Sequence, residues 1–143
     1  MATRIKSKTA VQPLPDAPKK AGQTSWTERR QAFAKSDPLR VVFVTAPEKE
    51  AETIARKLLE ERLIACANLL KGVQSLYWWE GKIGESAETL IVMKTPASKI
   101  NALMKRVREL HSYSVPEFLA LGIMEANPAY AAWARKETES EFK

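Results

Sequence analysis

Cysteine and histidine are the scarcest residues with metal-binding or reactive side chains, because the chain of 143 residues contains one of each. Cys66 has no partner for a disulfide within the chain, so nothing in the sequence indicates a disulfide-stabilised secreted protein. One histidine supplies only one acid–base partner and falls short of the ligand set of a typical imidazole or thiolate metal site. The sequence also lacks a Gly-rich phosphate loop and a Gly-x-Ser-x-Gly motif, so we expect the protein not to be an enzyme.

Long apolar runs are also missing. No segment approaches the roughly 18–20 apolar residues that cross a bilayer, and the N-terminal region lacks the unbroken apolar stretch of a secretory signal. We therefore expect a cytoplasmic protein with no membrane partner.

Positive charge is confined to the N-terminal segment of the chain. The formal net charge is +6. Residues 1–40 contain nine Lys or Arg and three Asp or Glu, whereas residues 41–143 contain 14 of each. Because nucleic-acid recognition depends on a basic surface, we expect no nucleic-acid partner for the folded body.

Residues 1–38 are predicted to be a basic, proline-containing N-terminal extension that is largely disordered or loosely docked, ahead of one folded domain at 39–143. Pro13, Pro15 and Pro18 are too closely spaced for a helix or a central strand. Ser25 is a candidate cap for a short helix over 25–35. Such a tail also suits contact with nucleic acid or anionic lipid, or mitochondrial targeting, but a solvated extension is the favoured interpretation.

Hydrophobic periodicity predicts four strand regions and three helices in the folded domain. A run of β-branched residues indicates a buried central strand at 39–45, and apolar residues at helical spacing indicate helices that follow 45–48, 95–96 and 127–128. The other strands are expected at 64–79, at 88–94 and at 118–124. This order predicts an α+β fold, a ferredoxin-like β-α-β-β-α-β plait with an extended β-hairpin and an extra C-terminal helix.

Turn and capping residues predict where these elements end. Thr45 and Thr95, each with a proline close behind, are predicted helix N-caps, and Asn127 before a proline is a third. Gly72 marks a break in the second strand region, and the polar segment 80–87 is predicted to be the turn of the long hairpin.

The predicted hairpin carries large apolar side chains on both faces. Tyr77 and Trp79 alternate with Trp78, so each face of the strand presents aromatic rings. Helices from the same chain normally cover only one face of such a sheet. We therefore predict a homo-oligomer in which other copies shelter the second face.

Several short motifs resemble those of one known family. In chain order they are Cys66-x-Asn68, Ser75-x-Tyr77-x-Trp79-x-Gly81-x-Ile83 followed by Glu88, Lys94-Thr95, His111-x-Tyr113-x-x-Pro116-Glu117 and Tyr130-x-x-Trp133. With this order and spacing, residues 39–138 resemble the divalent-cation tolerance protein CutA family. The resemblance implies a ferredoxin-like subunit in a compact homotrimer, and a role in tolerance of copper and other divalent metals that includes copper binding.

Two residues are candidate metal ligands, His111 and Cys66. Some family members bind copper through a cysteine at the end of the first strand and two adjacent histidines at the end of the second helix. Here Val44 and Leu110 stand at two of these positions, and only His111 is retained. Alternatively, His111 is structural, facing the negative end of a helix dipole, and Cys66 is a small buried residue. We expect no metal to be required for folding.

The other polar and aromatic motif residues are candidates for a cleft between subunits that binds a divalent cation or a small ligand. They are Asn68, Tyr77, Trp79, Glu88, Lys94, Tyr113, Glu117, Tyr130 and Trp133. Glu88 and Lys94 share one face of a predicted strand, so they either form a buried ion pair that fixes the register of the oligomer or line this cleft. The aromatic residues also suit ordinary packing in a core or an interface.

Three functional hypotheses follow. The first is a trimeric divalent-cation (copper) tolerance or metal-response protein that binds a metal ion or small ligand at the subunit boundary. The second is a small-molecule signalling trimer, because nitrogen-regulatory proteins of the PII type are similar in architecture. The third, an enzyme acting through Cys66, predicts a thiol that reacts at neutral pH.

Overall fold

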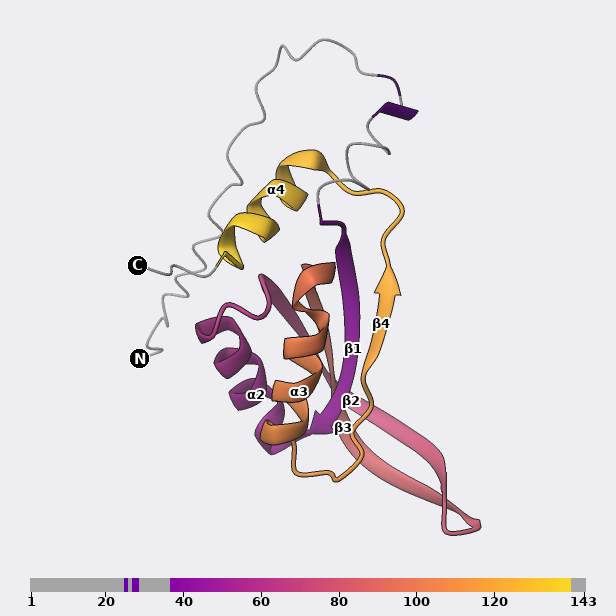
Figure 1. Cartoon of the computed structure of the whole chain (residues 1–143). Helices are drawn as coiled ribbons and strands as arrows, with labels where there is room; N and C mark the ends of the chain where they lie inside the picture. The colour runs from indigo at the N-terminus through magenta and orange to yellow at the C-terminus, as the bar shows by residue number, and fades with distance from the viewer. Residues whose placement is uncertain (1–24, 26, 29–36, 140–143) are drawn as a thin grey trace, which may run out of the picture.

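The computed structural model describes residues 25, 27, 28 and 37–139 of the chain (Figure 1). Its strands are β1 (Leu39–Pro47), β2 (Cys66–Trp79), β3 (Lys82–Pro96) and β4 (Leu119–Gly122). Its helices are α2 (Glu48–Glu60), the 3₁₀ turn η1 (Ala97–Lys99), α3 (Ile100–Leu110) and α4 (Pro128–Glu137). This order confirms the predicted α+β plait with its extra C-terminal helix.

The strands form one antiparallel sheet in the order β2-β3-β1-β4. β1 pairs with β3 along its whole length and with β4 from Arg40 to Phe43, so β1 and β3 are the central strands. The prediction of a central first strand is therefore confirmed. β2 and β4 are the two edges of the sheet in a single chain.

Helices α2 and α3 lie side by side on one face of this sheet and bury it (Figure 1). Alternate residues of β1 and β3 supply the sheet side of the core, and one apolar stripe of each helix supplies the other side. The buried residues of this core are Val42, Val44, Ala46, Ala51, Ile54, Ala55, Leu58, Ile64, Ile91, Met93, Leu103 and Val107. None of the described helices has the length and apolar character needed to cross a membrane.

The opposite face of the sheet is also apolar, but its centre is not buried within one chain. Strand register places seven apolar side chains on it, which we call the open face: Val41, Phe43, Leu70, Leu90, Val92, Leu119 and Leu121. All seven are half-buried or exposed. Because a sheet face in contact with water is normally polar, this apolar surface indicates an interaction site.

Helix α4 packs at the end of the sheet where β1 begins. Its Ala131 and Ala134 are fully buried in a small second core with Leu39 of β1 and with Ala65, which precedes β2. Two small residues on α4 allow the helix to approach the sheet closely. The helix therefore covers this end of the sheet and leaves the rest of the open face uncovered.

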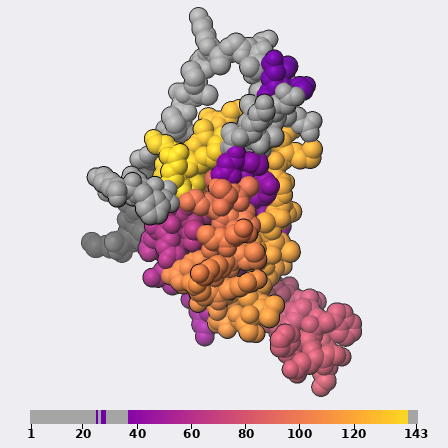
Figure 2. All heavy atoms as spheres, viewed as in Figure 1, coloured from indigo at the N-terminus to yellow at the C-terminus, as the bar shows by residue number. Residues whose placement is uncertain are grey.

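Strands β2 and β3 extend past the other strands as a long hairpin that stands clear of the body of the molecule (Figures 1 and 2). The register of β2 shifts between Leu70 and Val73, and Gly72 adopts a φ of +75° there. The predicted break in this strand region is therefore confirmed. At the far end, Trp78 and Trp79 are 76% and 62% exposed in one chain.

The prediction of a hairpin turn over 80–87 is wrong. Pairing continues to Trp79 and Lys82, and the turn consists only of Glu80 and Gly81. Both turn residues have positive φ, at +48° and +73°. Positive φ at both positions is the geometry of a tight two-residue hairpin turn, which matches the twist of the strands.

Two of the three predicted helix caps are wrong. Thr45 and Thr95 lie within β1 and β3, and the helices that follow begin at Glu48 and, after η1, at Ile100. Sheet pairing continues past both threonines, whose β-branched side chains suit a strand. Asn127 does cap α4, because its side-chain oxygen accepts a hydrogen bond from the backbone N–H of Ala129 at 3.0 Å.

The described residues before β1 make contacts of two kinds: one within the segment around Ser25, and others from Asp37 and Pro38 to η1. Ser25 and Glu28 form a capping box: Ser25 Oγ accepts the Glu28 N–H at 3.2 Å, and Glu28 Oε2 accepts the Ser25 N–H at 2.8 Å. The prediction of Ser25 as a cap is therefore confirmed. Asp37 Oδ1 accepts the N–H of Ser98 at 2.9 Å, which ties the start of the domain to η1. The remainder of the predicted extension over 1–38 lies outside the described residues.

Candidate functional site

The nine predicted cleft residues do not converge within one chain. Four of them, with Cys66, form a basic cluster near the start of β1: Cys66, Asn68, Lys94, Tyr130 and Trp133. Four others, with Ser86, form an acidic cluster at the other end of the sheet: Tyr77, Ser86, Glu88, Tyr113 and Glu117. Trp79, the ninth, pairs with Lys82 next to the hairpin turn.

The two clusters lie at opposite ends of the β2–β3 pair. Glu88 and Lys94 are six positions apart on the same face of this strand, which corresponds to about 20 Å at about 3.3 Å per residue. No ion pair joins them within the described chain. The two predicted roles, an ion pair that fixes the register of the oligomer or the lining of a cleft between subunits, stay predictions. The sequence pattern placed Glu88 and Lys94 on the same face of β3, as observed. It did not show whether the group that pairs with each of them belongs to the same chain or to another copy.

Lys94 is the charged centre of the basic cluster. Its ammonium donates a hydrogen bond to Asn68 Oδ1 and lies 3.7 Å from Cys66 Sγ. Cys66 stands directly opposite Lys94 in the β2–β3 register, which brings the three side chains together on the same face. Neither Asn68 nor Cys66 is a carboxylate. Among the described residues, Lys94 forms no ion pair.

Tyr130 connects α4 to the basic cluster. Burial, and secondarily the neighbouring Cys66 sulfur, raises the pKa of Tyr130 to about 12. The ring of Tyr130 lies 5.5 Å from that of Trp133, centroid to centroid, with the planes inclined by 41°. The phenol is therefore held against the thiol by a tilted aromatic pair.

Glu88 is the most buried residue of the acidic cluster. Only 5% of its surface is exposed, and its Oε2 atom is fully buried with no hydrogen-bond partner in the described part of the chain. Burial raises the pKa of Tyr113, and the adjacent Glu88 carboxylate raises it further. A buried carboxylate oxygen without a donor is costly, so a positively charged or donating group at this position would stabilise it.

Glu117 and Tyr77 complete the acidic cluster. Partial burial raises the pKa of Glu117, and the negative charge of Glu88 adds to the effect, so the two carboxylates are close enough to interact. The Tyr77 hydroxyl lies 2.7 Å from Ser86 Oγ. The Tyr77 ring covers Gly84, where an added Cβ would approach the ring to 2.7 Å, so glycine is required for this ring position.

His111 is bonded to the protein through both ring nitrogens. Its Nε2 lies 2.7 Å from the carbonyl oxygen of Thr45, and its Nδ1 accepts the backbone N–H of Tyr113 at 3.0 Å. A ring that accepts at Nδ1 carries its proton on Nε2 and donates it to Thr45, which is the neutral tautomer. Glu50 Oε1 lies 3.8 Å from Nδ1. In this arrangement neither nitrogen is free to bind a metal.

The two candidate metal ligands do not meet. His111 contacts Thr45, whereas Cys66 lies across the sheet in line with Lys94 and Val41, about 13 Å away along β1 at about 3.3 Å per residue. Among residues 37–139, no three His, Cys, Asp or Glu side chains are grouped so as to hold a metal ion. One chain alone therefore does not fit a copper site.

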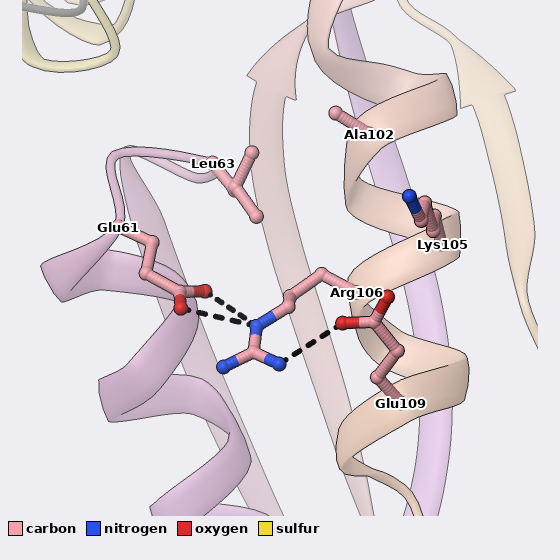
Figure 3. A pocket seen from close by; sticks show the side chains of 6 residues that line it. All are labelled: Glu61, Leu63, Ala102, Lys105, Arg106 and Glu109. Carbon is pink, nitrogen blue, oxygen red and sulfur yellow. Dashed lines mark hydrogen bonds and ion pairs between the residues drawn. The ribbon is translucent and has the colours of Figure 1, made fainter.

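A separate hollow lies between α2 and α3 (Figure 3). Arg106 spans it, with Nε at 3.0 and 2.9 Å from the two carboxylate oxygens of Glu61 and with Nη1 at 3.0 Å from Glu109. These hydrogen bonds, and the Arg106 charge, hold the pKa of Glu61 below its usual range. None of the predicted site residues lines this hollow. The Arg106–Glu61 ion pair joins α3 to the end of α2, whereas the Arg106–Glu109 pair lies within α3.

Sequence reasoning missed two contributors to the site. Ser86 lies two positions from Glu88 on the same face of β3, and the alternation of the strand was sufficient to place it there. Glu50, in the first turn of α2, approaches His111 from another element. No local sequence pattern connects these two residues.

Comparison with known proteins assigns the chain to a family. A family model described as CutA1 divalent ion tolerance protein matches residues 40–137. The chain belongs to the CutA family. The resemblance predicted from the motifs is confirmed, and the match covers every strand and helix from β1 to α4 apart from Leu39, the first residue of β1.

Curated relatives include plant, bacterial and animal proteins. Protein CutA 1, chloroplastic, of rice is 40% identical over 116 residues, which is 80% of this chain and 66% of that protein. The divalent-cation tolerance protein CutA of Thermus thermophilus is 46% identical over 99 residues, which is 68% of this chain and 96% of that protein. Human protein CutA is also 46% identical over 99 residues, but only 55% of that protein is covered. The chain thus spans nearly all of the bacterial relative and a little over half of the human one.

Solved structures share the fold. The divalent cation tolerance protein of Thermus thermophilus superposes with a TM-score of 0.69 at 44% identity, covering 71% of this chain and 99% of that one. A structure described as PII-like protein CutA from Nostoc, in apo form, gives a TM-score of 0.67 at 33% identity, covering 70% and 97%. The CutA and PII-like descriptions therefore apply to the same architecture.

The raised pKa of Tyr130 predicts a loss of stability in alkali. A tyrosine whose folded pKa lies above its ordinary value of 10.0 favours folding below pH 10, and this contribution is lost as the pH rises through about 12. We expect ultraviolet titration of phenolate to show a last transition near pH 12 that is missing in Tyr130→Phe. Cys66→Ala should lower this transition only in part, because burial is the larger cause. A Tyr130→Phe titration identical to that of the wild type would contradict the assignment.

Proposed function

We propose that this protein is a homotrimeric divalent-cation tolerance protein that binds a cation or small ligand where its subunits meet. Membership of the CutA family supports the tolerance role. The open face, with Phe43 and Val92 at its centre, supports self-association, because it is an apolar sheet surface that one chain does not bury. The proposal of an assembly rests on this surface. The acidic and basic clusters at its two ends supply polar groups for a ligand.

The proposed ligand site lies at the subunit boundary and not within one chain. The acidic cluster offers two interacting carboxylates and two phenols, and the basic cluster offers an ammonium and an amide. Carboxylate oxygens suit hard divalent cations. A site that draws on two copies would complete the ligand set that a single copy does not provide.

A second candidate function is small-molecule sensing by a trimer of the PII-like kind, without a metal role. Two observations favour it: the Nostoc structure is described as PII-like, and residues 37–139 contain no three-ligand metal group. The aromatic rings of both clusters would then contact an organic ligand.

We propose no catalytic role for the chain. Lys94 is the one group shown next to the Cys66 thiol that carries charge at neutral pH, and no histidine lies beside it to act as a base. The cytoplasm is the proposed location; the rice relative is described as chloroplastic, so fractionation of the host cell decides this point.

Sedimentation equilibrium of the full chain at micromolar concentration tests the assembly. We expect a mass three times that of the 16.1 kDa chain, because the open face is sheltered only when copies associate. Val92→Lys, which places a charge at the centre of this face, should dissociate the assembly while circular dichroism stays unchanged. A wild-type mass of one chain would reject the homotrimer.

Calorimetric titration with Cu²⁺ and Zn²⁺ separates the two candidate functions. If the cation binds the acidic cluster, Glu117→Gln should weaken binding about tenfold or more, as expected for loss of one charged ligand. His111→Ala should leave the isotherm unchanged, because both ring nitrogens already have protein partners. A wild-type titration with no heat for either ion would reject the metal role and leave the PII-like candidate.

A further inference from the structure

Two charged side chains, Glu88 and Lys94, lie at opposite ends of the open face. Neither has an oppositely charged side chain beside it among the described residues. At one end, the buried Oε2 of Glu88 has no hydrogen-bond donor among the described residues. At the other end, Asn68 and Cys66 are the hydrogen-bond partners of the Lys94 ammonium within the described part of the chain. Both residues lie on β3 at even spacing, so both project from the face that the proposed assembly buries.

Burying this face without neutralising these charges would be unfavourable. An ionised group that loses water and gains no partner is strongly destabilising, whereas an ammonium and a carboxylate that meet with good geometry largely offset that cost. Within one chain the two groups cannot meet, since about 20 Å of β3 separates them at about 3.3 Å per residue. Neither group therefore meets an opposite charge in the part of the chain that the structure describes.

We infer that Lys94 of one copy enters the acidic cluster of the next copy and pairs there with Glu88 and Glu117. The inference rests on the proposed homotrimer. In a closed ring, the interface joins two different patches, so one end of each sheet face meets the opposite end of its neighbour. Every Lys94 then finds a carboxylate and every Glu88 finds an ammonium.

The acidic cluster also presents the acceptor groups that an ammonium needs. An ammonium has three N–H donors, and the cluster presents the unpaired Glu88 Oε2 together with the Glu117 carboxylate. The phenol rings of Tyr77 and Tyr113 line the same cluster and tolerate a cation at their faces. The composite site therefore contains Asn68, Cys66 and Tyr130 from one copy and both tyrosines from the next.

The test is a double-mutant cycle on the full chain with Lys94→Met, Glu88→Gln and the double variant. The subunit dissociation constant is measured by sedimentation in a fixed, moderate concentration of guanidinium. Residues more than about 7–10 Å apart normally act independently, so within one chain the two effects should multiply. If the groups meet between copies, each single variant dissociates about tenfold or more readily, and the double variant no more readily than the worse single one.

Two further variants keep the result decisive. Glu117 is exposed in one chain, so Glu117→Gln folds without difficulty and replaces Glu88→Gln in a second cycle if that variant is unfolded. Glu80→Gln, in the hairpin turn, is the matched control and should act independently of Lys94→Met. Multiplying effects in a wild-type trimer would overturn the composite site and leave the homotrimer standing. A wild type that sediments as one chain would reject the homotrimer itself, and the composite site with it.

Discussion

A sheet with helices on one side only is the constraint on which the rest of this structure depends. Helices α2 and α3 bury one face, and α4 covers just the end of the other, where Ala131 and Ala134 meet Leu39. Phe43 and Val92 remain on an apolar surface that water does not favour. The long hairpin adds the indole rings of Trp78 and Trp79, which are exposed in a single chain. These exposed apolar surfaces are the basis of the proposed assembly.

The charged groups on this face also lack oppositely charged partners in the described part of one chain. Glu88 is buried next to Tyr113 and has an unpaired oxygen, while Lys94 is held by Asn68 at the opposite end. Like charges repel and opposite charges attract. A surface with opposite charges at its two ends therefore favours one orientation of a neighbouring copy. In the proposed assembly, an apolar centre would favour association of the copies, and the oppositely charged ends would favour one alignment of them.

Much of the fold was predictable because its patterns are local. Alternation along β3 placed Glu88 and Lys94 on one face, and Asn127 before a proline identified the start of α4. The caps proposed at Thr45 and Thr95 failed because strand pairing continued through both positions, a tertiary effect that no short motif reports. The role of His111 was equally hidden, since both of its hydrogen bonds go to backbone groups, one of them 66 positions away in sequence. Motif order identified the family, but only geometry separated the candidate site into two clusters.

The central claim is that the open face is covered in the native protein, and photo-labelling with a small diazirine, resolved by residue, tests it most directly. Leu58, fully buried in the core, and Leu59, which is 37% exposed on the outer side of α2, provide internal references for no access and free access. The account predicts that Phe43 and Val92 are labelled as weakly as Leu58. Labelling of both residues at least as strong as that of Leu59 would show a bare sheet face and would contradict it.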